Sequence, residues 1–138
     1  VHWRRTDFLL VRRTQPGVLQ SAEDLVQHVQ RLMRRERVNR VYLATDCDDA
    51  AELAYVEEKL QPVRYDVPVG ESLKERAMFA NIEIAICGSA SYFLGTKTST
   101  FTLAIIEERQ ATFGREAGTA SEMRDLSTLK SIPPPAAP

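Results

Sequence analysis

The hydrophobic pattern of this chain predicts short buried strands that alternate with amphipathic helices. Apolar side chains recur at helical spacing in four segments: residues 21–37, 50–60, 71–90 and about 98–112. Short apolar runs typical of strands precede or separate these segments, at residues 1–3, 41–44, 63–67 and 92–94. This order predicts an α/β fold, with a Rossmann-like parallel sheet and helices on both faces.

Particular residues mark the ends and inner faces of the expected helices. Ser21 with Asp24 resembles an acidic variant of a capping box, and Gly114 is suited to end the last helix. The Arg-rich residues 4–14, which precede the turn signal Pro16-Gly17, are expected to form a loop. In segment 71–90, the spacing predicts an inner face made of Met78, Ile82, Ala85 and Ile86.

The length of 138 residues, with 43% hydrophobic composition, fits one globular domain. That domain is expected to cover residues 1–126, while residues 127–138 are rich in proline and read as a disordered tail. The chain begins at Val1, without Met, in what reads as the end of a strand, so we expect a fragment of a longer protein. No apolar run approaches the roughly 18 residues of a membrane span, and any signal peptide of the longer protein is expected to lie outside this fragment.

The charge composition permits an anionic ligand and argues against nucleic acid as a partner. Fourteen of the eighteen basic residues are Arg, whose planar guanidinium matches phosphate and carboxylate groups. The net charge is −1, however, and no long basic face is interleaved with aromatic residues. Cys47 and Cys87 lie in no CxxC or Cys/His spacing, so structural zinc is not expected and their redox state stays open.

The most distinctive stretch, residues 92–109, combines a short strand, a hydroxyl-rich turn and a helix. Thr98, Ser99 and Thr100 lie where a helix leaves its first backbone N–H groups without partners. Those donors and the positive helix end suit a phosphate. The same hydroxyls could instead cap the helix, with Thr98 as the expected cap.

Two further loops are expected at the same edge of the sheet, residues 4–7 and 45–49, since ligands of such sheets bind at the carboxyl ends of the strands. His2 and Arg4 are two residues apart on a strand, so both can point to one face, where Arg4 could clamp a pyrophosphate. The alternative is that Arg4 and Arg5 are solvated or paired with Asp7, and that His2 is a core residue.

Acidic residues offer a second kind of chemistry. Asp46, Asp48 and Asp49 follow a strand and could hold Mg²⁺, although Asp at a helix start is commonly a cap. Glu83 lies in an otherwise apolar helical stretch, where its carboxylate either faces solvent or reaches a specific donor. Glu107, Glu108 and Arg109 are expected to form structural ion pairs. No catalytic triad can be assembled, because His28 lies on a helix away from these loops.

Three motifs, VHWRRTDF, VYLATD and ICGSASYFLGTKTSTFTLAIIEER, occur in an order and at separations that resemble the GDP-fucose protein O-fucosyltransferases. The likeness covers about residues 1–126 and is greatest to the branch that modifies thrombospondin type 1 repeats. It implies the C-terminal, donor-binding half of a two-domain GT-B glycosyltransferase of the endoplasmic reticulum lumen. The N-terminal domain, with a catalytic Glu and much of the acceptor groove, would then lie outside this chain.

The resemblance also implies roles for individual residues. His2, Trp3 and Arg4 match the segment that binds GDP-fucose, in which Arg4 contacts the pyrophosphate and supports departure of GDP. Thr100 and Phe101 match the pair that holds the phosphates, with Ser99 as a neighbour. Glu83 stands where the family usually has an Asp that binds guanine.

The expected reaction is an inverting transfer of fucose to Ser or Thr, with GDP-fucose as donor and without a metal or other cofactor. Two alternatives stay open. The first is a nucleotide-sugar-binding domain without catalysis. The second is a Mg²⁺-dependent α/β phosphotransfer domain built on Asp46 and Asp48.

Overall fold

Strands and helices alternate along the chain in the computed structural model, which describes residues 1–11, 14, 18–65, 72–114 and 121–122. The elements are, in order, β1 (His2–Trp3), α1 (Phe8–Val11), α2 (Ala22–Glu36), β2 (Ala44–Thr45), α3 (Ala50–Leu60), α4 (Leu73–Ser89), β3 (Leu94–Gly95), α5 (Thr100–Phe113) and β4 (Ser121–Glu122). The predicted α/β class is therefore confirmed. None of the described helices is long and apolar enough to cross a membrane.

The paired strands are all parallel, as the alternation predicts. β1 pairs with β2, with His2 opposite Ala44, and β3 pairs with β4. The side chain of Thr96 links the end of β1 to the loop after β3, because its hydroxyl accepts from Arg4 N (2.8 Å) and donates to His2 O (3.1 Å). The carboxyl ends of β1 and β3 consequently lie together.

The strand predicted at residues 63–67 is reduced in its described part to one parallel bridge between Tyr42 and Val63. Two backbone hydrogen bonds hold this bridge, from Leu43 N to Val63 O (2.9 Å) and from Val63 N to Val41 O (2.8 Å). Residues 66–67 and the tail predicted at 127–138 lie outside the described residues. The pairing of β4 with β3 was not predicted, because Ser121 and Glu122 belong to no apolar run.

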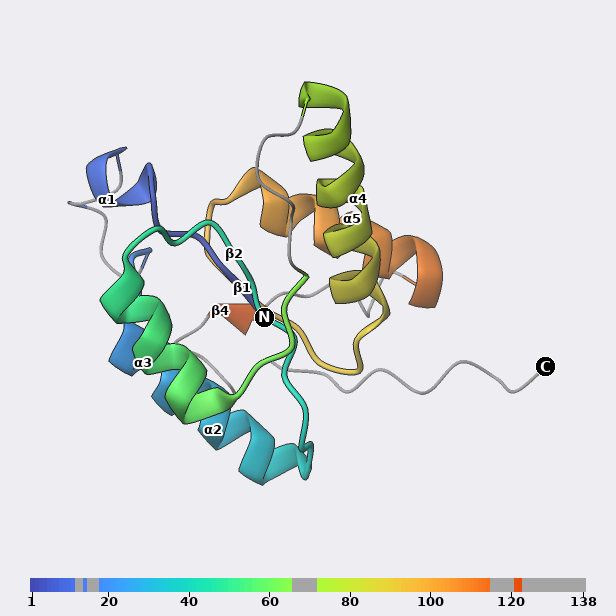
Figure 1. The fold of residues 1–138 in the computed structure, drawn as a ribbon. Helices are drawn as coiled ribbons and strands as arrows, with labels where there is room; N and C mark the ends of the chain where they lie inside the picture. Colours follow the sequence, from blue (N-terminus) through green and yellow to red (C-terminus); the bar gives the residue numbers. More distant parts are fainter. Residues whose placement is uncertain (12–13, 15–17, 66–71, 115–120, 123–138) are drawn as a thin grey trace.

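Helices pack on both sides of the strands, with α2 and α3 on one side and α4 and α5 on the other (Figure 1). The first core cluster joins Trp3 of β1 to Leu25 of α2 and Val56 of α3. The second joins Phe93 to Cys87 of α4 and Ile105 of α5, with Ala44 of β2 among them. Each side chain buried in these clusters contributes about 1.5–3 kcal/mol of hydrophobic stabilisation if it is as large as Val or Leu.

The inner face predicted for α4 is partly wrong. Met78 and Ala85 are exposed, Ile82 and Ile86 are half-buried, and the fully buried positions of this helix are Cys87 and Gly88. Two features explain the difference. Apolar residues occur on several sides of α4, so their spacing does not select one face, and the first turns of the helix project beyond the strands (Figure 1).

Within the Arg-rich segment 4–14, which is predicted to be a loop, the described residues 8–11 are helical. Backbone hydrogen bonds from Leu9 N to Arg5 O and from Val11 N to Asp7 O form the single helical turn α1. Phe8 is buried and holds this turn against the domain, whereas Leu10 is 84% exposed. α1 follows residues 4–7 directly in the chain, so it holds the carboxyl end of residues 4–7 in place.

Arg109 has a structural role, as predicted, and its described hydrogen bonds are to backbone carbonyls. Its buried guanidinium donates to three carbonyl oxygens at the end of α4: Cys87 (3.1 Å), Gly88 (3.2 Å) and Ala90 (2.7 Å). Burial lowers the pKa of Arg109 to about 10, so the side chain is still charged at neutral pH. A cation at this position stabilises the negative carboxyl end of α4 and holds α5 against it.

Candidate functional site

Four of the predicted site residues line one cavity at the carboxyl ends of β1 and β2. The cavity has a volume of about 80 Å³ and is lined by His2, Arg4, Thr45, Asp46, Glu83 and Phe101. At roughly 30 Å³ per water molecule, it fits one polar group of a ligand rather than a whole nucleotide. The residues come from the ends of β1 and β2 with the residue or two that follow each, from α4 and from α5, so the fold brings them together.

A larger cavity of about 360 Å³ opens among α2, residues 37–42 and residues 91–92. It is lined mainly by apolar side chains such as Val29, Leu32 and Met33, and it contains none of the predicted site residues. We therefore consider the smaller cavity the candidate functional site.

His2 is a buried, neutral member of the site. Its Nδ1 shares a hydrogen bond of 2.7 Å with the hydroxyl of Thr102, and its ring lies 4.9 Å from that of Phe101. Burial, above all, lowers the pKa of His2 to about 3. The imidazole thus ties β1 to the first turn of α5 and carries no charge to a ligand at neutral pH.

The two adjacent arginines point to opposite sides of the strand, as alternation requires. Arg4 lines the cavity together with His2, which confirms that these two side chains share a face. Arg5 is buried on the other side, where it pairs with Glu52 and lies 5.2 Å from the ring of Trp3. Arg5 is therefore structural, and Arg4 is the arginine of this segment that a ligand can reach.

Arg4 is paired with two carboxylates. Its Nε lies 2.9 Å from Asp7 Oδ1 and 3.1 Å from Asp46 Oδ2. The hydrogen bond from Arg4 also lowers the pKa of Asp7. Pairing with Asp7, one of the alternatives, is thus confirmed. The terminal nitrogens of Arg4 make no hydrogen bond within the described part of the chain, so they can still donate to a ligand.

Asp46 anchors the segment that carries Arg4. Its Oδ1 accepts from Arg5 N at 2.7 Å, and its Oδ2 accepts from the hydroxyl of Thr6 and contacts Arg4. Both oxygens are thus engaged by protein donors, which leaves a poor ligand for Mg²⁺. Asp49 caps α3 by accepting from the N–H of Ala51 (2.9 Å) and of Glu52 (3.0 Å), as the capping alternative predicts.

The remaining acidic residue of that predicted metal cluster, Asp48, is exposed. Among the residues that the structure describes, no group of three or more His, Cys, Asp or Glu side chains could hold a metal ion.

Glu83 reaches a specific donor rather than solvent alone. Its Oε1 accepts a hydrogen bond of 3.1 Å from the hydroxyl of Tyr42, and its side chain lines the cavity from α4. Burial raises the pKa of the Glu83 carboxyl, while the hydrogen bond from Tyr42 lowers it. Sequence reasoning missed Tyr42. Its position two residues before Ala44, on the same side of the strand, was the signal that could have found it.

The start of α5 lies beside the cavity without a side-chain cap. Ser99 is the N-cap residue, yet no described side chain makes a capping hydrogen bond there. The predicted cap, Thr98, instead has a φ of 64°, in the left-handed region. Ser99 is buried, Thr100 is exposed and Phe101 lines the cavity. The first backbone N–H groups of α5 thus have no helical partner and lie at the rim of the site.

Trp3 takes a different place from the other predicted site residues. Its side chain is fully buried in the first core cluster, and its Nε1 donates to Gln20 O at 3.1 Å. With no exposed surface, the indole has no access to a ligand. Any contact by Trp3 is limited to its backbone.

Comparisons with known proteins identify the family of the chain. The family model for GDP-fucose protein O-fucosyltransferase matches residues 2–112. Proteins named GDP-fucose protein O-fucosyltransferase 2 from Homo sapiens and Caenorhabditis elegans are 37% and 34% identical to the chain, each over 80% of it and 25% of their own length. The protein of that name from Drosophila melanogaster is 33% identical over 86% of the chain and 24% of its own length.

The chain thus spans about a quarter of the length of these relatives. The family model covers most of the chain, including the segments that carry His2, Arg4, Glu83 and Phe101. On these grounds, the chain belongs to the GDP-fucose protein O-fucosyltransferase family.

Proposed function

We propose that this chain is the donor-binding part of a GDP-fucose-dependent protein O-fucosyltransferase. Family membership supports the proposal, and one observation carries it. Residues from four separate segments, among them His2, Arg4, Glu83 and Phe101, line one cavity beside the uncapped start of α5. Arg4 and Glu83 both line this cavity. The cavity holds only one polar group, so the rest of a nucleoside diphosphate is proposed to lie across its rim, with the cation serving the diphosphate and the carboxylate serving the base.

The diphosphate is proposed to bind between Arg4 and the first turn of α5. Unpaired backbone N–H groups and the positive end of the helix favour an anion there. Thr100 and Phe101 supply N–H donors, and Ser99 supplies its hydroxyl, because its own N–H donates to Thr96 O at 3.3 Å. Arg4 contributes its terminal nitrogens, since Nε is already paired with Asp7 and Asp46. The guanine is proposed to bind Glu83, whose carboxylate accepts from the N1–H and the 2-amino group.

In the proposed reaction, a Glu outside this chain removes the proton from a Ser or Thr hydroxyl of the acceptor. The oxygen attacks the anomeric carbon of fucose with inversion, and the bond to GDP breaks. Negative charge then grows on the leaving diphosphate, where Arg4 and the N–H groups of α5 stabilise it. Loss of one such donor commonly lowers kcat by about 10²–10³-fold. The proposed reaction needs no metal.

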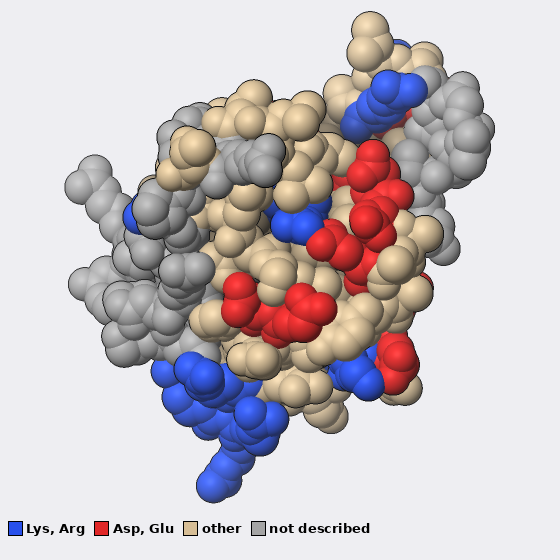
Figure 2. All heavy atoms as spheres, turned by 90° about the vertical axis from the view of Figure 1, so that its left-hand side faces the viewer, with Lys and Arg blue, Asp and Glu red and all other residues tan. Residues whose placement is uncertain are grey.

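The proposal extends to the whole protein. The chain would be the C-terminal, Rossmann-like domain of a GT-B enzyme, and an N-terminal domain would supply the base and much of the acceptor groove. The proposed acceptor is a thrombospondin type 1 repeat in the endoplasmic reticulum lumen. Nucleic acid is not a proposed partner: the face in Figure 2 carries acidic side chains across its middle and a separate basic group at its lower left, rather than one basic surface.

A nucleotide-sugar-binding domain without catalysis is the second candidate. Two observations favour it: the pKa of His2 is too low for a general base, and both oxygens of Asp46 are occupied by protein donors. The engagement of Asp46 equally disfavours the Mg²⁺-dependent phosphotransfer alternative. Transfer assays with the longer protein decide between the fucosyltransferase and the domain that only binds. Fucose is transferred to a folded repeat only if the protein has a catalytic base.

Calorimetry of GDP binding to this chain, with and without EDTA, tests the donor site itself. The proposal predicts binding that EDTA leaves unchanged and that weakens for GMP, which lacks the second phosphate. Binding that requires Mg²⁺, or that is equal for GDP and GMP, would contradict it.

A further inference from the structure

Tyr42 links the strand layer to the carboxylate that α4 contributes to the cavity. Its hydroxyl donates to Glu83 Oε1 at 3.1 Å, across 41 positions of sequence. We propose that Tyr42 is a positioning residue, which fixes the Glu83 carboxylate in the orientation that reads guanine. This inference rests on the proposed function, because it assigns Tyr42 a role in guanine recognition at the same site.

The backbone of Tyr42 is held firmly enough for this role. The hydrogen bonds between Leu43 N and Val63 O (2.9 Å) and between Val63 N and Val41 O (2.8 Å) flank it on either side. Its ring is half-buried and packs against the second core cluster. The backbone that carries the hydroxyl is therefore anchored to the neighbouring strand segment.

Glu83, in contrast, needs such an anchor. It is half-buried on α4, and its side chain has several rotatable bonds whose freedom is lost on binding a ligand. Tyr42 occupies one lone pair of Oε1, and a carboxylate has about four acceptor positions. Enough acceptors are left for both the N1–H and the 2-amino group of guanine, and their direction is set before the ligand arrives.

Tyr42 also affects the ionisation of the Glu83 carboxyl. Burial opposes the ionised form, and the hydrogen bond from Tyr42 and the charge of Arg64 favour it. The other titratable groups that face or adjoin the carboxylate are His2, Arg4, Asp46 and Cys87. Loss of the Tyr42 hydroxyl should therefore raise the pH below which GDP binding is lost.

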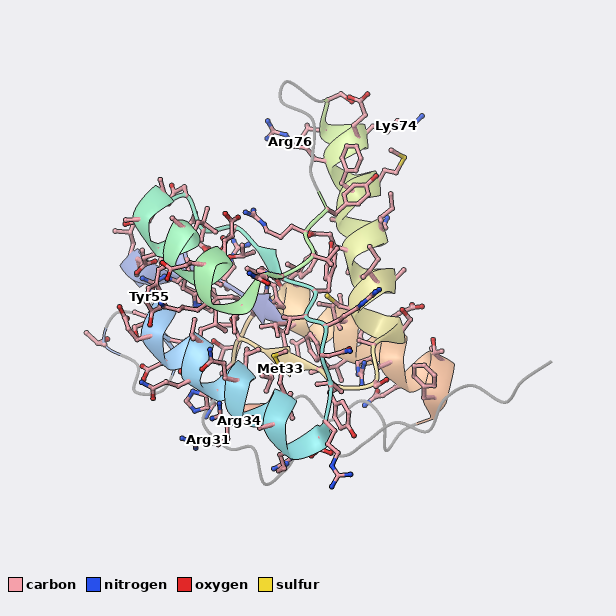
Figure 3. The ribbon with its side chains drawn as sticks, turned by 60° about the horizontal axis from the view of Figure 1, so that its bottom comes forward. Arg31, Met33, Arg34, Tyr55, Lys74 and Arg76 are labelled. Carbon is pink, nitrogen blue, oxygen red and sulfur yellow. The ribbon has the colours of Figure 1, made fainter. Side chains whose placement is uncertain are left out.

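The test compares Tyr42→Phe with a matched control, Tyr55→Phe on α3 (Figure 3), by calorimetry with GDP and with IDP, which lacks the 2-amino group. Tyr42→Phe should weaken GDP binding about tenfold, the size expected for a hydrogen bond to a charged group. It should weaken IDP binding less, and its pH midpoint for GDP should rise. Tyr55→Phe should change none of these quantities. Phe has the shape of Tyr, and thermal unfolding checks that both variants are folded.

A double-mutant cycle shows whether Tyr42 acts through Glu83. In a Glu83→Gln background, Tyr42→Phe should have no further effect on GDP binding. An equal loss in both backgrounds, or GDP binding by Tyr42→Phe that matches the unchanged chain, would overturn the inference while leaving the proposed function intact. If the unchanged chain does not bind GDP at all, the proposed function fails, and the inference fails with it.

Discussion

The first turns of α4 and α5 differ in how their free backbone N–H groups are treated. Each helix leaves its first backbone N–H groups without a helical partner. In α4, side chains of the helix start provide the missing partners: Ser72 Oγ accepts from Glu75 N (3.3 Å), and Glu75 Oε2 accepts from Ser72 N (2.8 Å). α5 begins at Ser99 with no side-chain cap from the described residues. The difference is what the proposed diphosphate site at the start of α5 requires, because only that helix start keeps its N–H groups for a ligand.

The surroundings of the two helix starts agree with this division. The first turn of α4 is exposed and projects away from the strands (Figure 1). The first turn of α5 lies at the cavity that Arg4 also lines, and it follows Thr98, whose φ of 64° costs of order 1–3 kcal/mol for a residue with a branched side chain. A strained, uncapped helix start beside a cation is a reasonable place for a diphosphate.

The largest expected effect comes from removing the cation beside α5. Arg4→Ala should weaken GDP binding about 10–100-fold, because hydrogen bonds to charged groups contribute about 1.5–3 kcal/mol and because Asp46 would then repel the phosphates. Calorimetry measures the change. Arg31→Ala removes the same charge from the exposed surface of α2 (Figure 3) and should leave the Kd unchanged. Equal losses in both variants would mean that overall charge attracts GDP.

Moving the start of α5 should have the next largest effect. A Cβ at Gly95 would lie 2.5 Å from Thr102 Cγ2 and 3.0 Å from Phe93 Cε1, both buried. Gly95→Ala should therefore lower stability by about 1–3 kcal/mol and weaken GDP binding, measured by thermal unfolding and calorimetry.

Gly88→Ala in α4 is the matched control for this substitution. Its Cβ would lie 2.7 Å from Cγ of Glu108, an exposed side chain that can turn away. Ala is also the better helix former, so stability should hold or rise. If both variants behave alike, the tight packing of Gly95 against α5 does not set the geometry of the site.

A pH titration should separate the ligand role of Glu83 from its effect on folding. GDP binding should weaken as pH falls through the raised pKa of this carboxyl, because the ionised form accepts from guanine. The effect on folding has the opposite sign: a raised pKa in the folded state means that Glu83 stabilises the fold most when protonated, and less as pH rises through that pKa. Glu83→Gln should remove both dependences, and GDP binding by this variant with an unchanged pH profile would refute the assignment.

The smallest expected effects come from the two serine N-caps. Ser72→Ala should lower stability by about 0.5–2 kcal/mol, the usual cost of losing a cap, and should leave GDP binding unchanged. Ser99→Ala has no capping bond to lose, so it should affect stability less but should weaken GDP binding a few-fold, about twofold to tenfold. Thermal unfolding and calorimetry of the two variants give the comparison, and the reverse pattern would contradict it.

Local patterns in the sequence predicted the features that depend on local periodicity. The order of strands and helices follows from hydrophobic spacing, and the shared face of His2 and Arg4 follows from strand alternation. Gly114, with a φ of 92° and its N–H bonded to Gln110 O, ends α5 as predicted. The Ser72–Glu75 capping box was overlooked although its S-x-x-E signature was visible.

Long-range contacts could not be predicted in this way. The pairing of Tyr42 with Glu83 and of Arg109 with the end of α4 joins side chains that no local pattern relates. Trp3 is buried because its side of the strand faces α2. Alternation in the sequence divides the side chains of a strand between two faces, but it does not show which face is buried in the core. The pairing of Arg4 with Asp46 depends on β1 and β2 being neighbours, which the topology decides.

The backbone amides of the two helix starts provide the most direct test of the account. In NMR spectra recorded while GDP is added, the amide signals of Thr100 and Phe101 should shift strongly, because their N–H groups bind the diphosphate. Those of Leu73 and Lys74, in the first turn of α4, should stay unchanged. Shifts of similar size at both helix starts, or none at α5 although GDP binds, would contradict the claim that the start of α5 holds the phosphates.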